Sequence, residues 1–234
     1  MLPEVRALKR PAVNRPDSLA SSFRRRRFAL ILELLAPLLA GRERVRVLDV
    51  GGRRDYWELV PAEIAPRLDI LILNNEDVEL ETGARPDDGL CVTYALGDAC
   101  EMPQYADGAF DLVHSNSVIE HVGSLQNMAR MADEVRRVAR AYYVQTPYLW
   151  FPIEPHYGVP FFHWLPAATR AQLGWKRKIG YRAQMPTWRA AAALADHTEL
   201  ADRTLMRELF PDAEHRRERF ALMTKSLIAF RRAA

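Results

Sequence analysis

The stretch Val45-Arg46-Val47-Leu48-Asp49-Val50-Gly51-Gly52 decides the fold of this chain. Its first six residues are mostly β-branched or aliphatic, and the run stops at an aspartate and two glycines. This pattern is typical of a buried strand that enters a tight turn. Glycine after a strand lets the backbone approach a ligand closely, and the N-terminus of the helix that follows can face an anion.

Further apolar runs end in the same way, at small or polar residues. We predict strands over 68–73, 91–96, 110–114 and 142–145, with an amphipathic helix over 125–140. Short apolar strands with helices between them predict the α/β class, with a mostly parallel sheet covered on both faces. Ligands of such sheets bind beyond the carboxyl ends of the strands. The residues at those ends are Asp49, Gly51, Gly52, Asn74, Asn75, Asp98, Ser115, Asn116 and Thr146.

The pattern also divides the chain into an arm and one domain. Residues 1–20 hold three prolines without a clear period, so we predict an irregular N-terminal arm. Asp17 or Ser18 can cap a helix that begins near Leu19 and ends at Gly41. We predict one domain over 21–234, closed by a short helix at 205–210 and a pair of strands at 219–230.

An insertion follows the fifth strand. Of the 22 aromatic residues of the chain, 12 fall between Tyr142 and Trp188, and prolines punctuate the same stretch. Proline excludes regular sheet or long helix throughout. We therefore predict a proline- and aromatic-rich lid or substrate insertion at about 148–190. The aromatic side chains from Trp150 to Trp164 fit a substrate pocket, a lid core or an oligomer contact.

Composition excludes several classes of protein. The 234 residues are 49% hydrophobic and 27% charged, with a formal net charge of +3, as in an ordinary globular domain. Lysine occurs four times, so 29 of the 33 basic residues are arginine, which fits either a GC-rich genome or a surface for phosphate or carboxylate groups. Two cysteines, Cys91 and Cys100, form no disulfide framework and no four-ligand metal site, so we expect a cytoplasmic protein. No apolar run is long enough to span a membrane, so we expect no membrane partner.

The glycine turn at 49–55 lacks two common nucleotide motifs. It is neither the dinucleotide fingerprint G-x-G-x-x-G nor a phosphate-binding loop that ends in Gly-Lys-Ser/Thr. Together, however, three segments in this order resemble class I S-adenosylmethionine-dependent methyltransferases of the type 11-like group. They are Val-Leu-Asp-Val-Gly-Gly (47–52), Gly-Asp-Ala (97–99) and Phe-Asp-Leu-Val-His-Ser-Asn-Ser-Val-Ile-Glu-His-Val (110–122). The resemblance covers about 20–147 and 205–230, and it implies a Rossmann-like, seven-stranded, mostly parallel sheet.

The resemblance also implies where S-adenosyl-L-methionine binds. An arginine among 24–27, for which we choose Arg26, would reach the cofactor carboxylate. The family loop usually carries more glycines, so Arg53 or Asp55 can contact the cofactor directly here, and Asn74 stands where the family usually has an acid. The implied cofactor-binding set is Asp49, Gly51 and Gly52 at the methionine portion, Asn74 at the ribose, Asp98 and Ala99 at the adenine, and Ser115 and Asn116 near the sulfonium, with Arg53 and Asn75 beside them at no particular part of the cofactor.

Two stretches offer a base for methyl transfer. Glu154 and His156 lie two residues apart on a proline-fixed loop after the fifth strand, so both can point to one side. A histidine is suited to remove a proton near neutral pH, and His121 competes with His156 for this role. In some relatives a Glu-x-x-Glu-His motif holds a metal ion. Here Ser117 replaces its first carboxylate, and Glu120 fits the N-terminal dipole of a helix better, so we predict no metal.

The sequence therefore predicts an enzyme that carries out methylation, transferring a methyl group from S-adenosylmethionine to an oxygen atom of a small-molecule acceptor. Two alternatives stay open: a non-catalytic relative that binds the cofactor, and an NAD(P)-dependent oxidoreductase. The enclosed aromatic loop favours a small acceptor over nucleic acid. The sequence leaves the oligomeric state open, including a homodimer.

Overall fold

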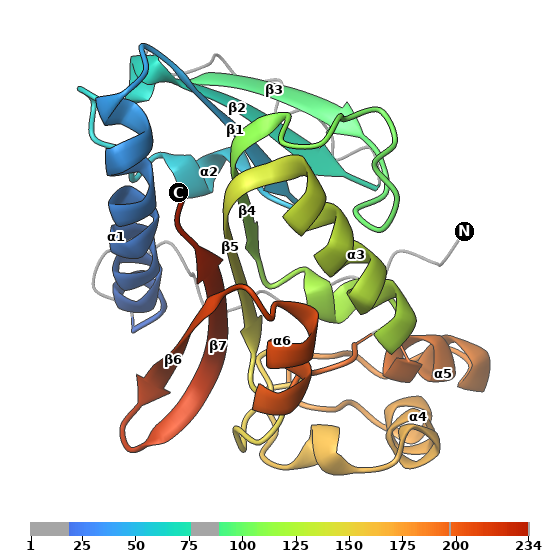
Figure 1. Cartoon of the computed structure of the whole chain (residues 1–234). Coiled ribbons are helices and arrows are strands. Elements are labelled where there is room, and N and C mark those ends of the chain that lie inside the picture. The colour runs from blue at the N-terminus through green and yellow to red at the C-terminus, as the bar shows by residue number, and fades with distance from the viewer. Residues whose placement is uncertain (1–18, 76–88, 197, 234) are drawn as a thin grey trace.

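The computed structural model describes residues 19–75, 89–196 and 198–233. Most of the expected N-terminal arm, including Asp17 and Ser18, lies outside this range. Within it, one seven-stranded sheet runs in the order β3-β2-β1-β4-β5-β7-β6 (Figure 1). The strands are β1 (Val45–Val50), β2 (Leu68–Asn74), β3 (Cys91–Leu96), β4 (Phe110–Asn116), β5 (Ala139–Pro147), β6 (Glu214–Phe220) and β7 (Met223–Arg231).

The pairing confirms the predicted α/β class. The first five strands are mutually parallel, and β7 closes the sheet antiparallel to both β5 and β6. The predicted bounds of β1 and β3 agree with the structure. β4 continues past the predicted end at His114, because Ser115 and Asn116 still pair with Val144 and Gln145 of β5. The polar residues expected just beyond this strand are therefore its last two residues.

Helices cover both faces of the sheet (Figure 1). On one face α1 packs its apolar side chains against β1, β2 and Trp57, and on the other α3 and α6 pack against β4, β5 and β7. Helix α3 is capped by the Ser124 hydroxyl, which accepts a hydrogen bond from Asn127 N at 3.1 Å. The helices are α1 (Leu19–Ala40), α2 (Arg54–Trp57), α3 (Leu125–Val138), α4 (Ala167–Lys176), α5 (Trp188–Asp196) and α6 (Arg203–Leu209).

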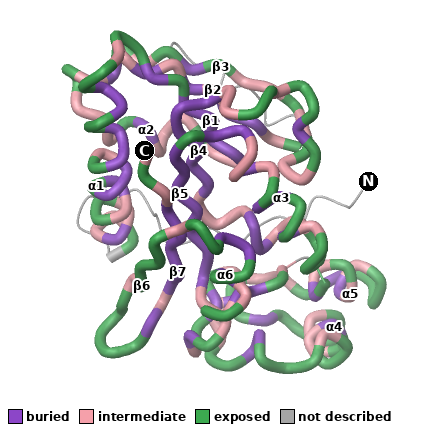
Figure 2. Tube along the Cα trace, in the orientation of Figure 1, coloured by how far each residue is buried: buried purple, intermediate pink, exposed green. Residues whose placement is uncertain are grey.

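The segment after β5 is more regular than the insertion predicted at about 148–190. It carries a short 3-10 turn (Phe162–Trp164) and then α4 and α5, which pack on each other through a small cluster of alanines and Met185. Figure 2 shows this segment as a mostly exposed layer below the buried strands β4, β5 and β7. No helix of the described residues is long and apolar enough to cross a membrane.

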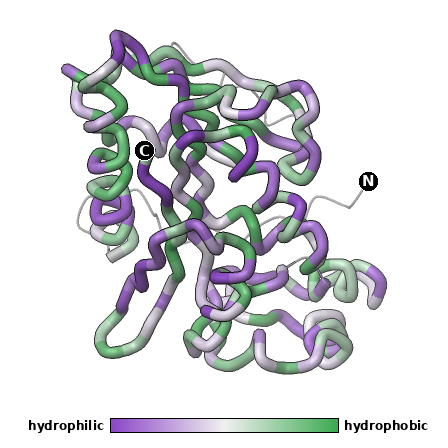
Figure 3. The backbone as a smooth tube through the Cα atoms, viewed as in Figure 1, coloured by the Kyte–Doolittle hydropathy of each residue, from purple (hydrophilic) through white to green (hydrophobic). Residues whose placement is uncertain are grey.

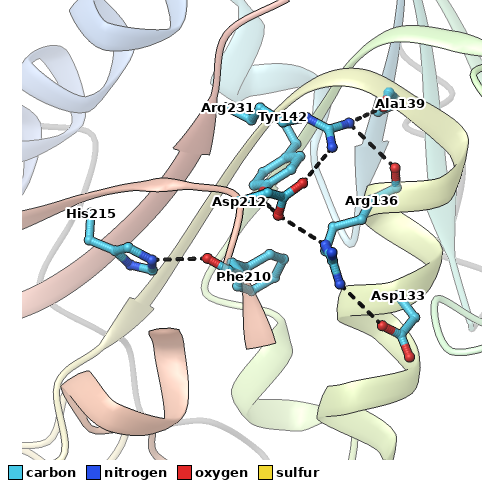
Figure 4. A network of polar contacts seen from close by, with 8 residues as sticks. All are labelled: Asp133, Arg136, Ala139, Tyr142, Phe210, Asp212, His215 and Arg231. Carbon is cyan, nitrogen blue, oxygen red and sulfur yellow. Dashed lines mark hydrogen bonds and ion pairs between the residues drawn. The ribbon is translucent and has the colours of Figure 1, made fainter. Parts of the chain in front are cut away.

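A polar network joins α3, β5, the α6–β6 connection and β7 (Figure 4). The Asp212 carboxylate accepts hydrogen bonds from Tyr142 Oη at 2.7 Å, Arg136 Nε at 2.9 Å and Arg231 Nη1 at 2.5 Å. Arg231 also donates to the carbonyl of Ala139 at 2.6 Å. The antiparallel strands are thereby fixed to the parallel part of the sheet near the amino end of β5.

Candidate cofactor and acceptor site

The turn after β1 needs both of its glycines. Gly51 has a φ of +66°, which favours glycine, and an added Cβ would lie 2.5 Å from Val118 Cγ2. A Cβ on Gly52 would lie 1.7 Å from Asp49 Oδ2. The backbone N–H of Gly51 also donates to Leu73 O at 2.7 Å. The turn is thus packed closely onto β1, β2 and Val118, and a cavity opens on each side of it.

Asp49 does not present a free carboxylate to a ligand. It is fully buried, and it accepts from Trp57 Nε1 at 2.7 Å and lies 2.6 Å from His114 Nδ1. Although Asp49 borders the first cavity, both of its oxygens are held by side chains of the protein. The expected direct contact with the methionine portion is therefore replaced by a positioning role, because Asp49 fixes Trp57 and His114 behind the cavity wall.

The first cavity, of about 360 Å³, lies between the start of α1, the glycine turn and α2. Several polar atoms that border it are buried without a hydrogen-bond partner among the described residues: Arg24 Nε and Nη2, Tyr56 Oη and His114 Nε2. Such orphaned polar atoms are costly unless a ligand satisfies them. A ligand carboxylate fits the donors of Arg24 and Tyr56, and Asp55 nearby suits a ligand ammonium group. This cavity therefore fits the amino-acid end of S-adenosylmethionine.

The arginine run on α1 divides between two directions. Arg24 and Arg27 border the first cavity, whereas Arg26 lies on the exposed face of the helix. The structure thus places Arg26, the residue chosen as the carboxylate ligand, away from the cavity, because helical periodicity turns positions 24 and 27 inward together. Arg27 donates to Glu218 at 2.7 Å and to Asn116 Oδ1 at 3.1 Å. These bonds hold its pKa above the ordinary value in spite of burial.

The second cavity, of about 700 Å³, lies beyond the ends of β1, β2 and β3. Its wall contains Asn74, Asn75, Asp98 and Ala99, as the sequence predicts, among apolar side chains. Asn74 Nδ2 donates to Gly52 O at 3.3 Å, which leaves its amide oxygen available to a ribose hydroxyl. Asp98 Oδ1 accepts from Cys100 N at 2.8 Å, which leaves the second oxygen for an amino group. The cavity fits a nucleoside, and Gly51 borders both cavities.

Two residues at the end of β4 differ in orientation. Asn116 borders the first cavity, as expected. Ser115 is fully buried in the sheet and borders neither cavity, because neighbouring residues of a strand point to opposite faces. Ser117, which has a φ of +59°, borders the second cavity in its place and donates to Gln145 Oε1 at 3.0 Å.

Three predicted catalytic residues form a hydrogen-bonded series. His121 borders the second cavity, and its Nε2 lies 3.0 Å from Nε2 of His156. His156 Nδ1 is hydrogen-bonded to the Glu154 carboxylate, which also accepts from the backbone N–H groups of His156 and Tyr157. Burial would raise the pKa of Glu154, but these bonds hold it below its usual value. Glu154 is therefore a carboxylate that orients His156, which in turn contacts His121.

Glu120 is a second acidic residue beside this series, and the sequence suggests it only as a metal ligand or a partner of a helix dipole. Its side chain is fully buried, Thr146 Oγ1 donates to Oε2 at 3.0 Å, and Oε1 has no partner among the described residues. Burial raises its pKa to about 7, although Thr146 and the charge of His156 lower it. The sequence predicts an interaction of the Glu120 carboxylate with the N-terminal dipole of a helix. A fully buried carboxyl group bonded to Thr146 does not fit that expectation. Its sequence signals are the adjacent His121 and the partial Glu-x-x-Glu-His motif at 117–121.

Tyr56 and His114 were also missed. His114 is stacked between Tyr56, at 4.7 Å between ring centroids, and Tyr143, at 5.5 Å. In the sequence, His114 is one polar residue in an apolar strand, and only its pairing with Asp49 of β1 turns it toward the first cavity. Within the described ranges, no group of three or more histidine, cysteine, aspartate or glutamate side chains is arranged to hold a metal ion.

Comparisons with known proteins agree with this geometry. Residues 70–141 match the family model of a methyltransferase domain, which covers less than half of the chain. The N-terminal domain of EvdMO1, solved with SAH bound, has a TM-score of 0.53 at 16% identity, over 90% of this chain and 81% of that one. An O-methyltransferase family protein from Burkholderia thailandensis has a TM-score of 0.51 at 15% identity, over 83% of this chain and 52% of that one. No curated protein sequence matches.

Proposed function

We propose that this chain, which carries a class I methyltransferase domain with S-adenosylmethionine as its cofactor, transfers the methyl group to an oxygen atom of a small-molecule acceptor. One observation carries the proposal. A histidine backed by a second histidine and a carboxylate borders the cavity that fits the cofactor nucleoside. An oxygen acceptor that must lose a proton needs a base of this kind at this place.

The protein would hold the cofactor across the glycine turn. Arg24 and Tyr56 suit the carboxylate, and Asn74 and Asp98 suit the ribose and adenine. When bound, S-adenosylmethionine supplies a methyl group on a positively charged sulfur that a nucleophile displaces. The chain would accelerate this displacement chiefly by alignment, which fixes the acceptor oxygen relative to the cofactor.

His121 is the proposed base, and His156 and Glu154 are its positioning residues. With Nδ1–H of His156 donating to Glu154, Nε2 of neutral His156 accepts from Nε2–H of His121. In this arrangement His121, whose side chain borders the second cavity, takes the acceptor proton. The resulting imidazolium is stabilised by His156 and by the negative charge of Glu154, as in other oriented histidines.

The enclosure of this series supports a small acceptor. Glu120 and Glu154 are buried, and the segment that carries Glu154 and His156 folds over the end of β5. The second cavity also has to hold the cofactor nucleoside, so an acceptor that reaches His121 beside it has to be compact. Duplex nucleic acid would require an open groove at this point instead.

Calorimetric titration with S-adenosylmethionine, S-adenosylhomocysteine and NAD separates the three functional classes. We expect affinities in the micromolar range for the two sulfur ligands and no heat with NAD. Asp98→Ala should weaken the binding of both sulfur ligands, because it removes the acceptor for the adenine amino group. No heat with either sulfur ligand would reject the cofactor assignment, and heat with NAD alone would indicate an oxidoreductase.

Turnover with phenols and other hydroxylated small molecules tests the base. His121→Ala should retain cofactor binding and lower turnover by about 10²–10⁴-fold, the usual contribution of a general base. Glu154→Gln should lower turnover less than His121→Ala does, and it should shift the pH–rate profile, because Glu154 acts through His156. His215→Ala is the control, since His215 bonds only to Phe210 O among the contacts described and lies away from both cavities.

Unchanged turnover of His121→Ala would exclude His121 as the base. Cofactor binding without transfer to any oxygen, nitrogen or carbon acceptor would indicate a non-catalytic relative.

A further inference from the structure

The hairpin between β6 and β7 ends in an apolar tip that contacts little of the protein. Leu222 is 94% exposed, and Phe220 and Met223 beside it are also exposed. Figure 3 shows this tip as hydrophobic at the end of a largely hydrophilic β6, and Figure 2 shows it as exposed. Exposed apolar side chains that stabilise no core usually mark an interaction site when they gather together.

Aromatic side chains of the segment after β5 extend this tip into a larger apolar surface. Phe220 lies 6.4 Å from Phe151 between ring centroids, and Trp150, which is 57% exposed, lies 5.9 Å from Trp164. Phe161 lies 4.9 Å from Trp164 and is exposed as well. Since Pro147 pairs with Ser226, the tip projects past the carboxyl end of β5. The surface thus lies at the edge of the molecule where the parallel strands end.

The charges around the apolar tip are positive. Arg25 and Arg26 are exposed on the first turns of α1, which contacts the hairpin through Phe23 and Phe220 at 6.3 Å. Arg217 and Arg219 are exposed on β6. The two acidic residues of β6 do not offset them at the tip, because Glu218 is turned inward onto Arg27 and Glu214 pairs with Arg232 at the far end of the strand.

A basic cavity lies beside the same hairpin. Its volume is about 260 Å³, and it is bounded by Arg203 and Arg207 of α6 and by Arg216 and Arg217 of β6, with no acidic side chain among the described residues that line it. Arg203 also lies over the ring of Tyr148, two residues before Trp150, at 5.5 Å. Arginine side chains arranged around a cavity suit a phosphate group, which they can bind in bidentate fashion.

We propose that this edge docks on an anionic lipid bilayer, with the hairpin tip among the acyl chains and the basic cavity on a headgroup phosphate. Apolar tips with flanking aromatic and basic residues suit the interface between acyl chains and headgroups.

Two other occupants fit this surface less well. Leucine and methionine bind no phosphate, which disfavours nucleic acid. Two arginine-rich edges repel each other, which disfavours a second copy of the chain. A peripheral surface of this kind needs no spanning helix. The proposal is independent of the methyl transfer.

Co-sedimentation of the full chain with phosphatidylcholine vesicles, with and without phosphatidylglycerol, tests the proposal. We expect binding that requires phosphatidylglycerol and weakens as salt is raised, because salt screens the arginines. The double variant Leu222→Ser/Met223→Ser should lose most of the binding. Arg25→Gln/Arg26→Gln should weaken it by about fivefold per charge. The matched controls are Leu125→Ser at the start of α3 and Arg44→Gln before β1, which should bind as the wild type does.

Several outcomes would overturn the proposal. Equal binding to both kinds of vesicle, or no binding to either, excludes an anionic bilayer. Unchanged binding of the Leu222→Ser/Met223→Ser variant excludes the tip. A dimer in solution that this variant dissociates assigns the surface to a second copy, and tight binding of an RNA oligonucleotide that competes with the vesicles assigns it to nucleic acid. Displacement from vesicles by low concentrations of soluble glycerol phosphate assigns the basic cavity to a small anion.

Discussion

At the scale of single residues, Asp49 and Glu120 have neighbours that adjacent sequence does not reveal. Asp49 follows a strand pattern that predicts a ligand contact, yet its oxygens are engaged by Trp57, eight residues later, and His114, in β4. Glu120 precedes a histidine at a helical turn, yet it lies buried under Thr146 of β5. In both cases the contacts across the sheet, and not the neighbouring sequence, decide what the carboxyl group touches.

Asp49→Asn should destabilise the protein by about 1–3 kcal/mol. The amide would present an N–H group to one of two buried donors, Trp57 Nε1 or His114 Nδ1–H, and leave that donor without an acceptor. Urea unfolding followed by circular dichroism measures the change. Asp69→Asn, at an exposed ion pair with Arg44, is the control and should change stability by less than about 0.5 kcal/mol. Equal stability of Asp49→Asn and wild type would show that the carboxylate charge is not needed there.

Glu120→Gln should remove a pH dependence of stability. The pKa of Glu120 is raised to about 7 in the folded protein, against about 4.3 in the unfolded chain. The contribution of Glu120 to the free energy of unfolding is therefore complete below about pH 4.3. It is lost as the pH rises through about 7, since the unfolded chain releases the proton of this carboxyl group first. We expect wild type to lose about 3 kcal/mol relative to Glu120→Gln between these limits. Parallel unfolding curves of the two proteins over this pH range would contradict the buried neutral carboxyl.

At the scale of elements, the strand and helix patterns are largely legible in the sequence, whereas the contacts between elements are not. The bounds of β1 and β3 follow from apolar runs closed by polar residues. The helices α4 and α5 within the proline-rich segment were not predicted, because their stability depends on packing against each other. The ion pair of Arg27 with Glu218 joins α1 to β6 across 191 positions, and no local pattern announces it.

Glu218→Gln should therefore loosen α1 from the hairpin. Both side chains are largely buried, with 13% exposure for Arg27 and 8% for Glu218, and the loss of the charge leaves Arg27 poorly compensated. We expect a loss of about 2–3 kcal/mol at pH 7. Glu33→Gln, at an exposed pair 3.8 Å from Arg216, is the control and should cost less than about 1 kcal/mol.

The loss of stability caused by Glu218→Gln should depend on pH. Burial would raise the pKa of Glu218, but the hydrogen bonds and charge of Arg27, with Lys225, hold it below its usual value. The stabilisation is thus present above about pH 4.3 and is lost as the pH falls through the lowered value. The difference between wild type and Glu218→Gln should narrow on acidification, and a difference that grows instead would contradict the ion pair.

At the scale of the whole molecule, the two cavities make ligand binding and stability interdependent. Buried polar atoms on α1, α2 and β4 that have no hydrogen-bond partner among the described residues border one cavity, and three strand ends border the other. A ligand that occupies both cavities should bind the folded protein and not the unfolded chain. Its binding should therefore raise the free energy of unfolding. S-adenosylhomocysteine at about 100 times its Kd should add about 2.7 kcal/mol, or about 5–10 °C in Tm, for a chain of this size.

Differential scanning fluorimetry measures this shift. NAD at the same concentration should leave Tm unchanged, because the turn at 49–55 lacks the dinucleotide fingerprint. Tyr56→Phe should reduce the shift with S-adenosylhomocysteine, since it removes one orphaned hydroxyl beside the first cavity. A larger shift with NAD than with S-adenosylhomocysteine would reverse the assignment of the cavities.

The sequence by itself determined the α/β class, the parallel core, the glycine turn and the row of polar residues at the strand ends. It could do so because burial of strands and the conformational needs of turns impose patterns on neighbouring residues. Only the tertiary structure decided that Arg27 rather than Arg26 faces the cofactor cavity, that Ser115 is buried, and that Asp49 is held by His114. Those outcomes depend on which side chains meet across strands and helices, and such pairings join residues far apart in the chain.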